Sequence, residues 1–124
     1  LQASNIPVSL FIDPAIEQIK ASAEIGATYI EIHTGNYAEA KLKAQSKELA
    51  KVKESTNIAR NLGLRVNAGH GLTYQNVEAI ASIQGIDELN IGHSIVARAL
   101  AVGLQQAVQE MKQLILTPRK DLIY

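Results

Sequence analysis

Two short turns of the sequence combine glycine with histidine after strand-like segments: Ala68-Gly69-His70-Gly71 and Gly92-His93-Ser94. Glycine lets a backbone approach a ligand closely. A turn that leads into a helix also offers free N–H groups and the helix dipole to an anion. One such turn alone is more often a tight connection between a strand and a helix. Because two occur at corresponding points, the pair predicts a site that grips a phosphate.

His70 lies between two glycines, so its imidazole should be accessible to a ligand at this turn. Imidazole titrates near neutral pH and can donate or accept a proton. A lone loop histidine is more often solvent-exposed or a loop cap, but the flanking glycines favour function. We therefore predict that His70 transfers protons.

Glu31 is a carboxylate inside a strand-like segment, on its polar face. A buried carboxylate is costly unless it is paired or used. Two interpretations stay open: an acid/base or electrostatic role, and a structural ion pair with Arg65 on the next strand. His33 follows on the same face and is predicted to hydrogen-bond a neighbouring loop.

Other polar side chains have less specific roles. Asn67 and Asn90 are predicted to orient Glu31 or a ligand water, or to hold a polar core network, and Asp13 to cap a helix. The three histidines lack the i, i+4 spacing of a helical metal site, and no DxDxDG-like loop occurs. A metal site is therefore not expected.

The elements that must position these residues alternate between strand and helix. Pro14 suits a first helical position, Gly26 and Gly63 suit helix ends, and Thr73 and Ser94 suit caps. The expected strands are 8–13, 28–33, 64–68 and 88–91, and the expected helices are 14–25, 38–62, 74–83 and 94–116. This alternation indicates an α/β fold with a parallel sheet.

The expected strands each have one apolar and one polar face, as Ile30 and Ile32 oppose Glu31 and His33. Parallel strands covered by helices on both faces are apolar nearly throughout. The alternation therefore favours a TIM (β/α)8 barrel, whose interior opens into a site, over an open doubly wound sheet.

A barrel needs eight βα units in typically ~250 residues. Residues 1–124 would supply half of one such domain and need the other half, or a second copy, to cover the sheet edges. Leu1 in place of Met suggests a cut or processed chain, or one whose earlier part is missing.

Composition narrows the class of protein. The 124 residues are 47% hydrophobic and carry no formal net charge, which is typical of one globular domain. Cysteine is absent, which excludes disulfides, and aromatic residues make up only 4%, which argues against nucleic-acid stacking platforms. No 18-residue apolar run or signal-like start occurs, so we expect an intracellular, cytoplasmic location.

Four motifs resemble the pyridoxine 5′-phosphate synthase family, in its order and at compatible spacing: Phe11-Ile12-Asp13, EIHTG (31–35), VNAGHGLTY (66–74) and ELNIGH (88–93). The resemblance covers about residues 8–116. It implies the last four βα units of a TIM barrel that forms a homo-octamer and needs no metal or organic cofactor. The implied reaction condenses 3-amino-2-oxopropyl phosphate with 1-deoxy-D-xylulose 5-phosphate to pyridoxine 5′-phosphate, with loss of phosphate and water.

The resemblance also implies roles for single residues. His70 matches the family's proton donor, and Gly71, Gly92 and His93 match its contacts to 3-amino-2-oxopropyl phosphate. Glu31 matches a glutamate inside the site, with an acid/base or electrostatic role. Because the family's first four strands carry further site residues, the chain alone is expected to lack turnover.

Two other hypotheses remain open. One is a non-catalytic, self-associating half-barrel that binds phosphate. The other is a different phosphate-handling barrel, such as a sugar-phosphate isomerase or an aldolase. A Schiff-base aldolase needs a buried lysine at a strand end, and no lysine lies in the four expected strands.

Overall fold

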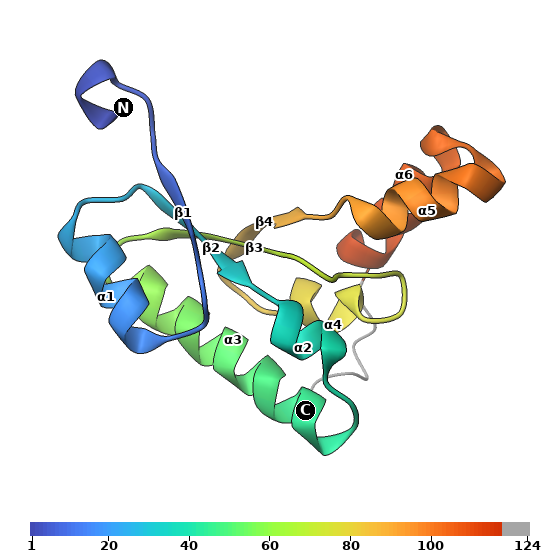
Figure 1. Cartoon of the computed structure of the whole chain (residues 1–124), viewed down its shortest axis with the longest axis horizontal. Helices are drawn as coiled ribbons and strands as arrows, with labels where there is room; N and C mark the ends of the chain where they lie inside the picture. The colour runs from blue at the N-terminus through green and yellow to red at the C-terminus, as the bar shows by residue number, and fades with distance from the viewer. Residues whose placement is uncertain (118–124) are drawn as a thin grey trace.

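The computed structural model describes residues 1–117 and shows a four-stranded parallel sheet with helices between successive strands (Figure 1). The strands are β1 (Ser9–Ile12), β2 (Tyr29–His33), β3 (Arg65–Gly69) and β4 (Ile86–Asn90), in the spatial order β1-β2-β3-β4. All three neighbouring pairs are parallel. The predicted α/β class and parallel sheet are thus confirmed. These strands lack the order reversal that marks a doubly wound sheet.

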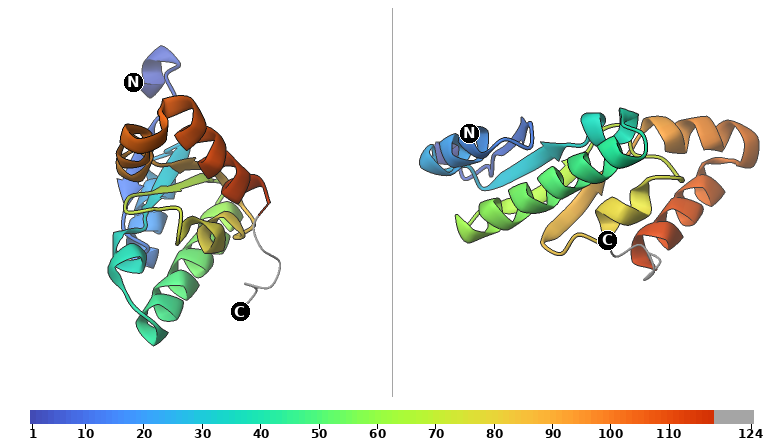
Figure 2. Two further views of the ribbon diagram at one scale, coloured as in Figure 1. Left: turned by 90° about the vertical axis from the view of Figure 1, so that its right-hand side faces the viewer. Right: turned by 90° about the horizontal axis from the view of Figure 1, so that it is seen from below.

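Helices cover one side of the sheet. They are α1 (Ile16–Glu24), α2 (Gly35–Glu39), α3 (Lys43–Asn61), α4 (Val77–Ala81), α5 (His93–Val102) and α6 (Leu104–Leu116), and a 3-10 turn, η1 (Gln2–Ser4), precedes β1. In Figure 1, α1 and α3 lie below the sheet, while its upper side, between the N-terminal segment and α5, carries no helix. The views of Figure 2 show the α5–α6 hairpin extending beyond the end of the sheet. Within residues 1–117, no helix is long and apolar enough to cross a membrane.

The core lies between the sheet and its helices. Ile30 and Ile32 of β2 and Val66 and Ala68 of β3 are fully buried, as their alternation with polar residues predicts. They pack in one cluster with side chains of the helices, among them Ile19, Val52, Ala59 and Ile80. On the opposite face of β1, Phe11 is 57% exposed. Apolar burial thus occurs on one face, and the other is free to form a site.

A β-bulge shifts the pairing of β3 with β4. Val66 pairs with Ile86 but Asn67 pairs with Glu88, so the residue between them on β4 has no partner. A bulge changes the alternation of faces. As a result Ile86 and Leu89 both pack against the core although three positions separate them.

Three predicted helices differ from those observed. The 38–62 helix is divided into α2 and α3 by a segment in which Leu42 has a φ of +49°. Of the predicted 74–83 helix only α4 forms. The Asn76 side chain accepts a hydrogen bond from the Thr73 N–H at 2.7 Å and holds a turn before α4. The 94–116 helix breaks into α5 and α6 at Gly103, whose φ is +83°.

The predicted caps Asp13, Thr73 and Ser94 are also wrong, because their side chains have other partners. Asp13 faces the ring of His33, and the Thr73 hydroxyl accepts the Gln75 N–H at 3.3 Å. The Ser94 hydroxyl donates to the Leu72 carbonyl at 2.7 Å, which ties the start of α5 to the loop after β3. The helices instead begin after Ala15, Asn76 and Gly92, without side-chain capping bonds.

An ion pair joins α5 to α6. The Arg98 guanidinium donates to the Glu110 carboxylate at 2.8 and 3.1 Å, and Gln106 donates to it at 2.9 Å. The hydrogen bond from Arg98, and to a smaller extent that from Gln106, lowers the pKa of Glu110 from 4.5 to about 2. A carboxyl with a lowered pKa in the folded state stabilises the fold above its unfolded pKa.

The contribution of Glu110 should therefore be present above about pH 4.5 and fade as the pH falls toward 2. We predict that Glu110→Gln lowers the Tm of the complete protein slightly at neutral pH, because the pair is solvent-exposed. The difference from wild type should disappear as the pH approaches 2. Glu54→Gln, at an exposed position of α3, is the control. A pH-independent difference would contradict this assignment.

Candidate functional site

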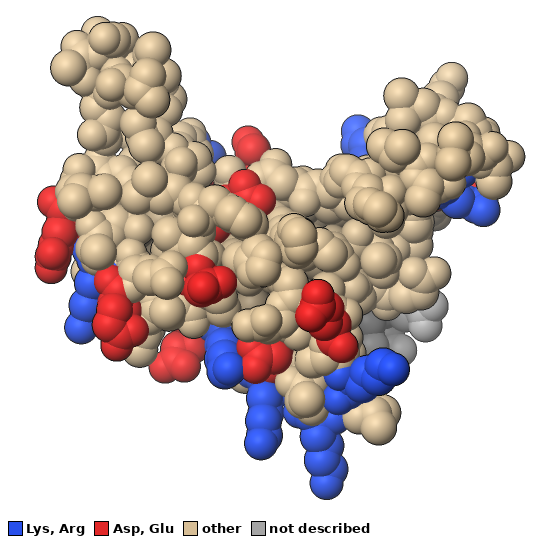
Figure 3. Space-filling model, viewed as in Figure 1, with Lys and Arg blue, Asp and Glu red and all other residues tan. Residues whose placement is uncertain are grey.

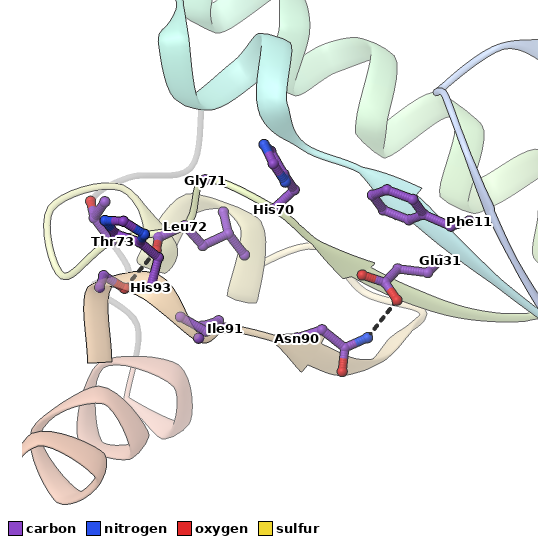
Figure 4. Close-up of a pocket in the computed structure, with 11 residues that line it drawn as sticks. Phe11, Glu31, His70, Gly71, Leu72, Thr73, Asn90, Ile91 and His93 are labelled. Carbon is purple, nitrogen blue, oxygen red and sulfur yellow. Dashed lines mark hydrogen bonds between the residues drawn. The ribbon is translucent and has the colours of Figure 1, made fainter. Parts of the chain in front are cut away.

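A cavity of about 440 Å³ opens at the ends of the strands (Figure 4). Its lining includes all the residues predicted to do chemistry or bind substrate: Glu31, His70, Gly71, Gly92 and His93. The other lining residues are Phe11, Leu72, Thr73, Asn90, Ile91 and Ser94. The loops after β3 and β4 therefore meet at one edge of the sheet, and the volume suits a small-molecule ligand.

The surface of the molecule agrees with this placement. Figure 3 shows the upper side hollowed between the projecting N-terminal segment and the α5–α6 hairpin. Most of the lysines and arginines visible in this view lie on the lower edge, along α3, and others lie on the α5–α6 projection at the right. The cavity has no lysine or arginine among its lining residues in the part of the chain that the structure describes. An anion bound there would depend on backbone N–H groups and histidines.

Glu31 points into this cavity from β2. Its Oε2 accepts a hydrogen bond from the Asn90 side chain on β4 at 2.8 Å (Figure 4). The alternative pair with Arg65 is wrong, because Arg65 is held at the other end of the strands. There its guanidinium donates to Asp87 at 3.0 Å and to the Tyr29 hydroxyl at 2.7 Å. Glu31 is thus left with its carboxylate toward the pocket, and Asn90 takes one of its predicted roles, that of orienting Glu31.

Gly69 makes room for this carboxylate. A Cβ at position 69 would overlap Glu31 Oε1 and lie 2.9 Å from the Asn90 carbonyl oxygen. Any side chain there would push Glu31 out of place. The glycine before His70 is therefore required by the packing of the site itself.

The backbone of His70 is held in an unusual conformation. Its φ is +81°, in the left-handed region that residues other than glycine, asparagine and aspartate seldom adopt. Thr34, which is fully buried, holds the turn: its N–H donates to the Gly69 carbonyl at 2.8 Å, and its hydroxyl lies 2.6 Å from the carbonyls of both Gly69 and His70. A strained backbone that buried contacts fix in place is typical of functional sites.

His33 lies beside His70. The ring centroids are 4.6 Å apart with an angle of 36° between the planes. His33 Nδ1 is 3.6 Å from Asp13 Oδ1. Instead of the predicted hydrogen bond to a neighbouring loop, His33 thus contacts a second imidazole and lies near a carboxylate.

The two glycine–histidine turns differ in what they offer an anion. α5 starts directly after Gly92, and its first backbone bond runs from the Val96 N–H to the Gly92 carbonyl, so the amides before Val96 lie at a free helix start. The turn after β3 does not lead directly into a helix, which corrects that prediction, because α4 begins only at Val77. Its contribution would come from loop backbone around Gly71.

The two glycines that were predicted to contact substrate also differ. Gly71 has a φ of +74°, and a Cβ there would lie 2.6 Å from the Ala38 Cβ, so the fold itself requires glycine. At Gly92 a Cβ would meet no atom within 4 Å, and φ is −123°. The described residues around Gly92 therefore leave open space at this position and do not themselves require glycine.

Sequence reasoning missed three residues that build the site. Thr34 fixes the His70 turn, Gly35 packs against both imidazoles, and Phe11 lines the cavity. The one available signal was their position in the motifs at the ends of β1 and β2. Within residues 1–117, no group of three or more His, Cys, Asp or Glu side chains is arranged to hold a metal ion.

Comparison with known proteins places the chain. Residues 1–117 match the family model described as "Pyridoxal phosphate biosynthesis protein PdxJ". The chain belongs to this family. It is 61% identical over all 124 residues to pyridoxine 5′-phosphate synthase of Prochlorococcus marinus (strain MIT 9303) and covers 51% of that protein.

Two further relatives carry the same name. The chain is 60% identical over its full length to the protein of Synechococcus sp. (strain WH7803), of which it covers 50%. It is 62% identical over 121 residues, or 98% of the chain, to that of Prochlorococcus marinus (strain NATL2A), of which it covers 49%. The chain thus spans about half the length of the curated relatives that it matches.

Proposed function

We propose that this chain is the C-terminal half of a pyridoxine 5′-phosphate synthase, a transferase-type enzyme of vitamin B6 biosynthesis. The complete enzyme condenses 3-amino-2-oxopropyl phosphate with 1-deoxy-D-xylulose 5-phosphate and releases phosphate and water. The observation that carries the proposal is the convergence of the two glycine–histidine turns and Glu31 on one cavity. Family membership and the names of the relatives support the same reaction.

The amino-oxopropyl phosphate is assigned to the loops of this chain. Its phosphate would lie between the backbone of Gly71 and that of Gly92 and His93, where the start of α5 favours a negative charge. The open space beside Gly92 supports this placement. A phosphate held there fixes the rest of the substrate, so that its binding energy serves orientation at the reacting carbonyl.

His70 and Glu31 supply the proton transfers. Imine formation, dehydration and ring closure move several protons without net oxidation or reduction, which suits an imidazole and a carboxylate in one pocket. We assign His70 the role of proton donor. Glu31, oriented by Asn90, acts as a base or stabilises a developing positive charge.

The complete fold is proposed to be a TIM (β/α)8 barrel with this chain as its last four βα units. The consecutive strand order, the helices on one side and a site at the strand ends all support a barrel segment. β1 and β4 are the outer strands, and in a closed barrel both would pair with strands of the N-terminal half. A homo-octamer, a cytoplasmic location and the absence of any cofactor also belong to the proposal.

Reconstitution tests this function. We expect pyridoxine 5′-phosphate when the N-terminal half of the barrel and this chain are combined with both substrates, and none from this chain alone. The product is measured by chromatography with mass detection. If the combined halves bind phosphate but form no product, and two copies of this chain associate instead, a non-catalytic half-barrel is the correct function.

A further inference from the structure

We infer that His33 is a positioning residue for His70, and that the two imidazoles act as one packed unit at the rim of the pocket. The inference rests on the proposed function, which makes His70 the proton donor. It concerns the orientation of that donor and assigns His33 no contact with substrate.

Three strand ends build this unit. Phe11 of β1 packs edge-on against the His33 ring of β2, with centroids 5.1 Å apart and an angle of 81°. The His33 ring also contacts the ring of His70, which directly follows β3, with centroids 4.6 Å apart. The carboxylate of Asp13, just after β1, lies 3.6 Å from His33 Nδ1. His33 therefore has three side-chain neighbours, which come from the ends of β1 and β3.

Gly35 also packs against this pair of rings. A Cβ at this position would lie 2.6 Å from His33 Cε1, 3.0 Å from His33 Nε2 and 3.1 Å from His70 Cδ2. Both rings thus pack directly against the backbone at the start of α2. The φ at Gly35 lies outside the left-handed region, so space for the imidazoles is what requires glycine here.

His70 needs such support. His70 is exposed, and the bond from Thr34 holds only its backbone carbonyl. The side-chain contact that fixes the direction of the imidazole within the part of the chain that the structure describes is the one with His33. Figure 4 shows the His70 ring at the side of the cavity, across from His93. Rotation of the ring would move its nitrogens away from a bound substrate.

The test is steady-state kinetics of the complete protein with three variants. His33→Ala removes the supporting ring, and His33→Phe keeps an aromatic ring without nitrogens. Tyr29→Phe is the control, because it removes a hydroxyl from the same face of β2 at the far end of the strand. A misplaced catalytic group costs about 10²-fold in rate, so His33→Ala should lower kcat by about that factor.

The KM for 3-amino-2-oxopropyl phosphate should change less than about threefold in His33→Ala, because the phosphate contacts remain. His33→Phe should restore most of kcat, and Tyr29→Phe should match wild type. Wild-type kcat in His33→Ala, or an equal loss in His33→Phe, would overturn the inference. If the wild-type protein itself forms no pyridoxine 5′-phosphate, the proposed function fails instead.

Discussion

Replacement of His70 by alanine is expected to lower the kcat of the complete enzyme by about 10²–10⁴-fold, the usual contribution of a positioned general acid. The imidazole lines the cavity, and among the lining residues that the structure describes the other imidazole is that of His93. The KM for 3-amino-2-oxopropyl phosphate should stay near its wild-type value, because the proposed phosphate contacts are backbone N–H groups that the substitution keeps. Initial rates of pyridoxine 5′-phosphate formation measure both constants.

His70→Gly is the matched control for stability. Both variants lack the imidazole and should be equally slow. Glycine adopts the φ of +81° without strain, so His70→Gly should be more stable than His70→Ala by about 1 kcal/mol. Urea unfolding measures this difference. A His70→Ala enzyme that keeps wild-type turnover would remove His70 from the mechanism.

Replacement of Glu31 by glutamine should lower kcat by roughly 10²–10³-fold, the range found when one electrostatic contact to a transition state is lost. Glutamine keeps an oxygen that can accept the Asn90 hydrogen bond, so the change isolates the negative charge. Glu88→Gln is the control, because this exposed carboxylate lies on β4 outside the lining of the cavity. It should leave kcat unchanged. Equal effects of the two substitutions would show that Glu31 has no specific role.

Much of the fold was predictable because its signals are local. Ile30 and Ile32, like Val66 and Ala68, alternate with polar residues along their strands. This alternation correctly predicted the buried face of the sheet. Gly26 and Gly63 correctly predicted the ends of α1 and α3, and both have positive φ values. These features depend on neighbouring residues, so the sequence contains them directly.

Features that depend on distant partners were not predictable. Asp13 and Ser94 are residue types that often cap helices. In the folded chain, however, Asp13 lies beside His33, and Ser94 hydrogen-bonds the Leu72 carbonyl. The break at Leu42 places a residue other than glycine at a positive φ, which no propensity indicates.

The same limit applied to the candidate site. His70 and Glu31 could be selected from their residue types and positions. Asn90 was also predicted as a residue that orients Glu31, and the structure shows this contact. The contacts of Thr34 and Gly35 with His70 could not be predicted, because they reach it across strands. Only the folded chain shows which of these residues share a cavity.

The most direct test of the account is a crystal structure of the complete protein with 3-amino-2-oxopropyl phosphate. We expect the phosphate between the two turns, with its oxygens within hydrogen-bonding distance of backbone N–H groups at Gly71 and at the Gly92–His93 start of α5. The His70 ring should face the reacting part of the same molecule. A phosphate bound at one turn alone, or elsewhere on the barrel, would contradict the account.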